Sequence, residues 1–216
     1  MKLAKYSADD TRIVDWSSVG IVGGLPVQES MPFPAQPLPQ QEKIVGAVFV
    51  VVTQAAQFFS LGRATFLLTV SMLISYFLWI GTRWKKEPEE ILPYYLLAVT
   101  VQCLHFAEEF FTGFHHEFAK LFGYEWSESE FALFNLGWLL LFALAVVGIR
   151  RGMPLAYLIL LFLAIAGGIG NGTGHLFLFA MGGRYFPGSV TPPFCLIMGI
   201  MLLVWVYRGA PKAKKD

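Results

Sequence analysis

The sequence predicts an all-α protein, a polytopic bundle of about six transmembrane helices. Hydrophobic residues make up 56% of the chain and charged residues only 14%, whereas a soluble domain carries about 25% charged residues. Long apolar segments with almost no charge follow one another from Ile44 onward, and basic residues gather in alternate connections between them. This composition excludes a cytosolic enzyme, a disordered protein and a fibre.

The apolar segments set the number of helices. A helix needs about 20 apolar residues to cross about 30 Å of hydrocarbon. The first segment is short and has an alternative interpretation as an in-plane helix, which would leave five spans. Ser127 and Glu130 have the spacing of a capping box and predict the start of the fourth span. The predicted spans are residues 44–61, 64–82, 91–114, 131–149, 154–181 and 193–207.

The regions outside the spans divide the chain into three parts. Residues 1–43 contain five prolines between Leu25 and Gln40, a density that excludes a helix there and predicts an extended arm. A disordered tail and an arm that contacts a partner subunit or the protein's own surface both remain open. Residues 44–208 form the predicted membrane domain, and residues 209–216 form a basic C-terminal tail.

The basic residues predict the orientation in the membrane. With six spans, thirteen Lys and Arg residues fall on the side of the N-terminus, and this asymmetry places both termini in the cytoplasm. The net charge of +1 argues against a nucleic-acid partner, because such binding needs concentrated basic charge. Membrane lipids are the expected partners. Three basic residues fall on the other side: Arg63, Lys120 and Arg184.

Both cysteines, Cys103 and Cys195, lie in apolar segments. We expect them to be buried as small hydrophobic residues, without a disulfide framework. Neither has the electropositive neighbours of a reactive thiol in the sequence.

The third predicted span contains charged groups that an apolar helix does not need. His105, Glu108 and Glu109 share one helical face. A charged residue at the bilayer centre costs roughly 2.5–3.5 kcal/mol on insertion scales, so the group predicts a site. Two adjacent carboxylates repel each other, so we expect at least one to be protonated, paired or bound to a cation. The structural alternative is that the glutamates merely end the span. His115 and His116 follow as secondary candidates.

A second set of polar residues is expected at the same outer end of the bundle. His175 and Asn171 are four residues apart in the fifth predicted span and share a face. In the loop that follows, Pro187 and Gly188 suit the centre of a type II turn, and Tyr185 would offer a hydroxyl at the rim of a roofed cavity. Two glycine pairs in the same span have the spacing that permits close helix packing: Gly168 with Gly172, and Gly170 with Gly174.

These motifs resemble the HXXEE-motif family of integral membrane proteins, over about residues 91–201. The resemblance implies a multi-pass membrane protein in which the motif residues are important, and it implies no reaction. Together with the charge pattern, it favours the bacterial inner membrane. The motifs occur in the order of the family: His105-x-x-Glu108-Glu109, then His175, then Tyr185-x-Pro187-Gly188.

Three functions are compatible with these residues. The first is a membrane-embedded enzyme in which His105, Glu108 or Glu109, and His175 bind zinc or non-haem iron. Such a site would act on a lipid or another apolar substrate by hydrolysis, hydration, isomerisation or oxidation. The second uses the same residues as a metal-free acid and base. The third is a non-enzymatic accessory subunit, or one that binds pigment or lipid, so whether the protein is an enzyme stays open.

Overall fold

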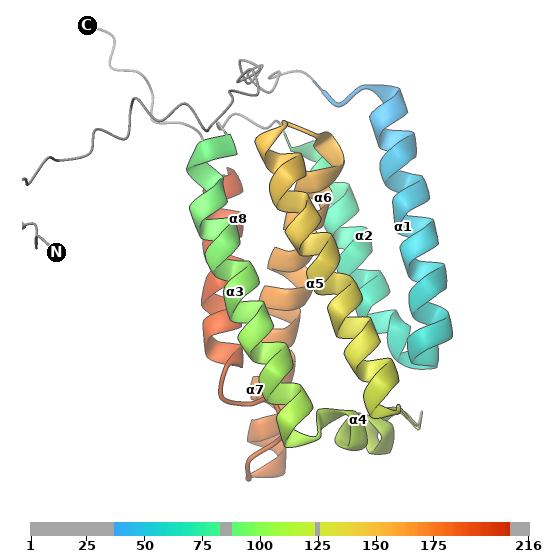
Figure 1. Cartoon of the computed structure of the whole chain (residues 1–216), viewed down its shortest axis with the longest axis vertical. Coiled ribbons are helices and arrows are strands. Elements are labelled where there is room, and N and C mark those ends of the chain that lie inside the picture. The colour runs from blue at the N-terminus through green and yellow to red at the C-terminus, as the bar shows by residue number, and fades with distance from the viewer. Residues whose placement is uncertain (1–36, 83–87, 124–125, 208–216) are drawn as a thin grey trace, which may run out of the picture.

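The computed structural model describes residues 37–82, 88–123 and 126–207, and it confirms the predicted all-α class. The described residues contain no strand, and most helices run along the long axis of one bundle (Figure 1). A 3₁₀ turn, η2 (Gly62–Ala64), joins α1 to α2, and a π-helical segment, η3 (Leu163–Gly170), joins α6 to α7. The helices are α1 (Gln40–Leu61), α2 (Thr65–Gly81), α3 (Pro88–Thr112), α4 (Phe114–Phe122), α5 (Glu128–Arg150), α6 (Pro154–Phe162), α7 (Asn171–Gly182) and α8 (Pro192–Tyr207).

Four helical stretches are long and apolar enough to cross a membrane. They are α1, α3 from Glu90, α5, and the continuous stretch from α6 through α7. The helices α2 and α8 are apolar but shorter, with 17 and 16 residues. Large apolar side chains such as Phe59 and Phe66 are exposed on the outer faces of the bundle. A surface of this kind indicates a membrane protein, because a soluble bundle would cover it with polar groups.

The first helix begins earlier than the sequence predicts. α1 starts at Gln40, directly after the extended Pro39, so residues 40–43 of the predicted arm are helical. α1 packs along α2 in the bundle and does not lie across its end (Figure 1). The length and apolar composition of α1 suit a span, as the six-span alternative predicts. The rest of the predicted arm, residues 1–36, and the tail 209–216 lie outside the described residues.

The third predicted span ends two residues early. α3 stops at Thr112 because Gly113 adopts a φ of +76°, a left-handed conformation that favours glycine. Phe114 consequently begins the short helix α4 instead of ending a span. α4 lies across the end of the bundle, between the end of α3 and the start of α5 (Figure 1).

Helix α5 begins at the predicted capping box, which the structure confirms. The hydroxyl of Ser127 accepts a hydrogen bond from the backbone N–H of Glu130 at 3.2 Å. The carboxylate of Glu130 in turn accepts one from the backbone N–H of Ser127 at 3.0 Å. This exchange satisfies two N–H groups that a helix start leaves free.

The core surrounds the stretch from α6 through η3. Every residue from Ala156 to Gly168 is buried, and α2, α5 and α8 all contact this stretch. A Cβ atom on Gly168 would lie 2.5 Å from the Cα of Gly199, so close packing against α8 requires glycine at this position. Gly172 packs equally closely on α8, whereas a Cβ on Gly174 would meet nothing within 4 Å. The predicted close packing thus applies to the first glycine pair and not to Gly174.

The two cysteines differ in their surroundings. Cys195 of α8 is buried, as expected, but Cys103 of α3 is exposed on the outside of the bundle. The prediction for Cys103 was wrong because an apolar segment does not show which of its faces points outward. Both cysteines are free thiols.

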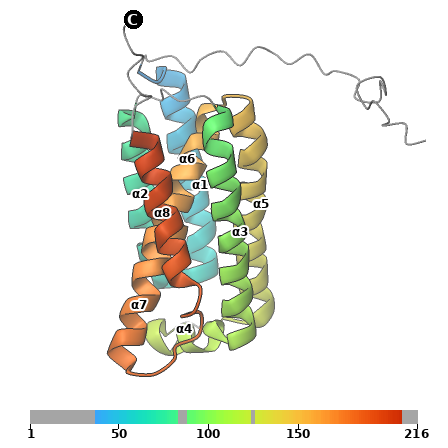
Figure 2. The ribbon, with the colours of Figure 1, turned by 90° about the vertical axis from the view of Figure 1, so that its left-hand side faces the viewer.

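The two ends of the bundle carry different elements. The start of α3, the α5–α6 turn and the end of α8 lie at one end (Figures 1 and 2). Helix α4 and the α7–α8 loop lie at the other end. The last turns of α3 and helix α7 lie toward this second end. They carry four of the residues that the sequence singles out: His105, Glu108, Glu109 and His175.

Candidate functional site

Three titratable side chains meet at the end of the bundle that carries α4. His105 and Glu109 come from successive turns of α3, where a spacing of four residues puts them on one face. His175 comes from α7. Their exposed fractions are 0%, 4% and 4%, respectively. The structure therefore buries three polar groups together, where each group alone would be unfavourable.

The donor atoms of these residues converge on one oxygen. Nε2 of His175 lies 3.0 Å from Oε1 of Glu109, and Nε2 of His105 lies 3.3 Å from the same oxygen. The two imidazole rings are perpendicular, with centroids 4.9 Å apart. One ligand atom from each residue lies within 4.8 Å of the other two. Two nitrogens and one oxygen form a donor set that suits zinc or non-haem iron.

Thr191 determines which nitrogen of His105 carries the hydrogen. Its hydroxyl donates to Oε2 of Glu108 at 2.5 Å and lies 2.8 Å from Nδ1 of His105. A hydroxyl has one hydrogen, so the hydrogen between Thr191 and His105 must sit on Nδ1. A neutral His105 then has a lone pair on Nε2, the nitrogen that faces Glu109. This nitrogen is buried and has no hydrogen-bond partner within the described part of the chain.

Glu108 has a different role from its neighbour. Its carboxylate accepts hydrogen bonds from the backbone N–H groups of Val190 and Thr191, both at 2.8 Å. It also accepts them from the hydroxyls of Thr191 and Tyr185, the latter at 3.1 Å. The sequence treated Glu108 and Glu109 as alternative ligands. Among the described residues, only Glu109 joins the group that could hold a metal, and Glu108 ties α3 to the start of α8.

The loop before α8 covers the site closely at Gly188. This glycine has a φ of +78°, as the predicted turn requires. A Cβ atom here would lie 2.8 Å from Cε1 of His175 and 2.9 Å from Cγ of Glu109. The ring of Phe186 lies 6.0 Å from that of His175, and the ring of Phe114 lies 5.0 Å from it, measured between centroids. The backbone of the turn and two aromatic rings thus shield the site.

Two other polar residues lie one helical turn before the histidines of the site. Asn171 begins α7 one turn before His175 and is half-buried, and it belongs to neither of the groups that could hold a metal among the described residues. Gln102, one turn before His105 in α3, is buried, and its Nε2 lacks a hydrogen-bond partner in the described structure. Asn171 and Gln102 are therefore neighbours of the site and do not contribute donor atoms to it.

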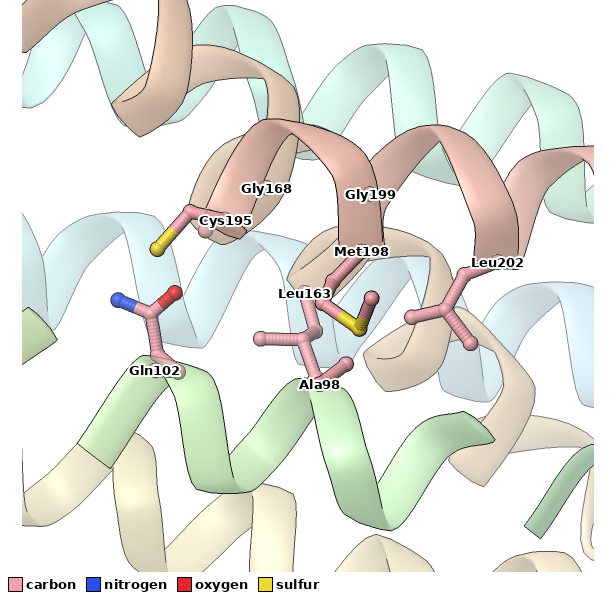
Figure 3. A pocket seen from close by; sticks show the side chains of 9 residues that line it. Ala98, Gln102, Leu163, Gly168, Cys195, Met198, Gly199 and Leu202 are labelled. Atoms are coloured by element: carbon pink, nitrogen blue, oxygen red, sulfur yellow. The ribbon is translucent and has the colours of Figure 1, made fainter. Parts of the chain in front are cut away.

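Gln102 borders a narrow slot between α3, η3 and α8 (Figure 3). The side chains of Gln102 and Cys195 both point toward it, and Gly167, Gly168 and Gly199 form part of its wall. Its volume is about 10 Å³, which is room for roughly one water molecule. The slot can therefore hold a water near the amide of Gln102, but not a substrate.

A second group of similar residues lies on the same end of the bundle. His115 and His116 of α4 and Glu128 of α5 have ligand atoms within 4.8 Å of one another. Burial and the neighbouring His116 lower the pKa of His115, against the opposite influence of Glu128. His115 is therefore neutral near pH 7. The sequence named both histidines as secondary candidates and missed Glu128, which is distant from them along the chain.

Thr191 is the main residue of the site that the sequence did not single out. Its carbonyl oxygen accepts the first hydrogen bonds of α8, from the N–H groups of Phe194 and Cys195. It stands directly before Pro192, the first residue of that helix. Threonine before a proline is a common signal for a helix start, and that signal could have identified it.

Comparison with known proteins gives a match to a family model. A family model described as "Protein of unknown function with HXXEE motif" matches residues 96–203, which is half of the chain. The matched range includes His105, Glu109, His175 and Thr191. No curated protein and no solved structure matches the chain.

Proposed function

We propose that this chain, which belongs to the family of proteins with the HXXEE motif, is a membrane-embedded enzyme that uses a metal ion to act on a lipid or another apolar substrate. His105, Glu109 and His175 hold the ion, which is zinc or non-haem iron. The observation that carries the proposal is the meeting of three buried donor atoms at one point. One of them, Nε2 of His105, lacks a hydrogen-bond partner among the described residues.

A cation between these atoms resolves an electrostatic conflict. When His105 carries a single hydrogen, on Nδ1, it directs a lone pair toward a carboxylate oxygen 3.3 Å away. Two buried acceptors that face each other are unfavourable unless a positive group lies between them. A proton can join two of the atoms, whereas a metal ion can bind all three. The presence of His175 as a third donor therefore favours the metal.

The chain also supplies the support that a metal ligand needs. A histidine that binds a metal usually donates its other N–H to a carboxylate, a carbonyl or a water, which fixes the orientation of the ring. Nδ1–H of His105 donates to the hydroxyl of Thr191, and this hydroxyl donates in turn to the carboxylate of Glu108. With its hydrogen bonds already filled, Glu108 serves as a positioning residue, not as a free base.

The ion would supply the chemistry that the side chains lack. Three protein ligands leave a position open, and a bound zinc or iron acts there as a Lewis acid that lowers the pKa of water to about 7. Zinc would direct the site to hydrolysis or hydration, and iron to oxidation. Tyr185, which is exposed and donates to Glu108, stands at the rim where a substrate headgroup would arrive.

The placement of the site supports an apolar substrate. Phe114 and Phe186 cover it, and the outer faces of the bundle carry exposed apolar side chains. We propose that the four long stretches and the shorter helices α2 and α8 all cross the bacterial inner membrane. We propose further that both termini lie in the cytoplasm, which puts the site at the outer side. Helices of 17 and 16 residues span about 25 Å, slightly less than the hydrocarbon core.

One observation favours a second candidate, a metal-free acid–base enzyme. Nε2 of His175 and Oε1 of Glu109 are at hydrogen-bond distance, 3.0 Å, inside an apolar bundle. Such a pair can move a proton to or from a substrate. In this candidate a proton on His105 takes the place of the metal ion. An isomerase or hydratase acting on an apolar substrate would use this chemistry.

Metal analysis of the purified protein separates the two candidates. We would compare wild type, prepared in detergent without chelator, with His105→Ala/His175→Ala and with Glu109→Gln. Glu90→Gln serves as the control, because it removes an exposed carboxylate at the other end of α3. We expect the other two variants to contain one equivalent of zinc or iron fewer than wild type and the control. The same metal content in all samples would overturn the proposed site, and no metal in any of them would favour the acid–base candidate.

A further inference from the structure

We propose that the same end of the bundle holds a second, solvent-accessible site for a divalent transition-metal ion. His115 and His116 of α4 and Glu128 of α5 form it. None of these residues belongs to the site of His105, Glu109 and His175, so the inference does not depend on the proposed function.

The glycine before α4 brings the histidines to the end of the bundle. Gly113, with its φ of +76°, lets the chain leave the axis of α3 and start α4 across the bundle (Figure 1). Along α4, His115 and Phe118 are buried against the rest of the protein, whereas His116 is exposed. α4 thus has one histidine inside and one facing the solvent.

The buried His115 makes only packing contacts in the described structure. His115 is 3% exposed, and neither of its ring nitrogens has a hydrogen-bond partner among the described residues. Its ring lies between aromatic neighbours, with centroids 6.4 Å from Phe110 and 5.6 Å from Phe131. A phenylalanine would fill this position without leaving polar atoms unpaired. The two unpaired nitrogens therefore indicate that His115 binds a ligand.

The rings of the adjacent histidines converge. Neighbouring residues of an α-helix point about 100° apart. The ring centroids of His115 and His116 nevertheless lie only 4.0 Å apart. Both side chains turn toward the space that Glu128 borders. This places two imidazoles and one carboxylate around one point, and two of the three groups are open to water.

The charged groups nearby leave Glu128 available for a cation. Glu130, in the same first turn of α5, is occupied by the capping box with Ser127. Lys120 of α4, which could compete for a carboxylate, is paired with Glu117 at 2.6 Å. Within the described ranges, Glu128 has no ion pair or hydrogen bond of its own. Its carboxylate can therefore serve as the third ligand.

Two imidazole nitrogens and a carboxylate oxygen suit zinc, with water in the remaining position. An ion here would fasten α4 to the start of α5. Phe114, the first residue of α4, packs on His175 with ring centroids 5.0 Å apart. The second site would thus stabilise part of the aromatic cover over the first one.

Zinc binding to the full chain in detergent tests the proposal. We would measure stoichiometry and affinity by equilibrium dialysis with zinc for wild type, His116→Ala and Glu128→Gln. Both substitutions change exposed side chains and leave the core intact. We expect each to weaken one zinc equivalent at least tenfold. Glu90→Gln, a change of an exposed carboxylate at the other end of the bundle, should bind like wild type.

The two sites are distinguished in a His105→Ala/His175→Ala background. There we expect one remaining zinc equivalent, which disappears when His116→Ala is added. A brief treatment of wild type with a chelator should remove this equivalent before the shielded one. Zinc binding by His116→Ala and Glu128→Gln equal to that of wild type would overturn the second site, whatever the outcome at the first.

Discussion

Nδ1 of His105 lies 2.8 Å from the hydroxyl oxygen of Thr191, whose own hydrogen is donated to Glu108. This relay joins the last turns of α3 to the residue that precedes α8. Nε2 of the same ring faces Oε1 of Glu109 at 3.3 Å, so it can donate a lone pair there when the ring carries its single hydrogen on Nδ1. The chemistry of a buried histidine on one helix thus depends on a residue at the start of another.

Replacement of Thr191 by valine tests this relay. Valine has a similar shape but no hydroxyl, so Nδ1 of His105 loses its acceptor and the ring orientation is no longer held. Loss of such a support typically costs about 10–100-fold in metal affinity. We expect that loss in a chelator-competition assay, whereas Thr191→Ser should retain most of the affinity. Equal affinity of Thr191→Val and wild type would contradict the relay.

The adjacent glutamates should respond differently to substitution by glutamine. Glu109→Gln replaces the ligand oxygen with an amide and should abolish binding at the first site, with little change in thermal stability. Glu108→Gln weakens charge-assisted hydrogen bonds to Val190, Thr191 and Tyr185. Hydrogen bonds to a charged group contribute about 1.5–3 kcal/mol each, so we expect a lower melting temperature with some metal retained. Metal content and thermal unfolding, measured on both variants, check this; identical profiles would refute the distinction.

Gly188 and Gly174 offer a matched pair of glycine-to-alanine changes. At Gly188 the φ of +78° and the short distances to His175 and Glu109 leave no space for a methyl group. We expect Gly188→Ala to destabilise the protein by about 1–3 kcal/mol and to displace the roof of the site. Gly174 lies in α7 with open space around it, so alanine there should be neutral or stabilise by about 0.5–1 kcal/mol. Thermal unfolding of the two variants in detergent decides; a tolerated Gly188→Ala would show that the turn does not press on the site.

Labelling of introduced cysteines tests the orientation, because the remaining Cys195 is buried. Lys120 lies in α4, at the end of the bundle that carries the site. Arg151 lies in the α5–α6 turn, at the opposite end of the bundle. In a Cys103→Ser background, we expect a membrane-impermeant maleimide to label Lys120→Cys in intact cells and to label Arg151→Cys only after lysis. The reverse pattern would invert the proposed orientation and put the site on the cytoplasmic side.

Much of the fold follows from local patterns in the sequence. The apolar segments predict the helices, because 20 or so uncharged residues have few stable alternatives outside a membrane. The capping box at Ser127 and Glu130 and the turn at Gly188 are equally local, since each depends on a few neighbouring residues. The end of α3 was predicted less well. Gly113 stops the helix there, and a single glycine within an apolar stretch does not reveal its φ.

The sequence alone determined the membrane class, the helical segments and the polar residues of α3 and α7. The tertiary structure decided which residues act together. Glu108 and Glu109 are neighbours on one helix. Only the arrangement of α3 beside α7 and α8 pairs Glu108 with Thr191 and Glu109 with His175. The periodicity of a helix tells which residues share a face, but the helix that packs against that face decides which partner each side chain meets.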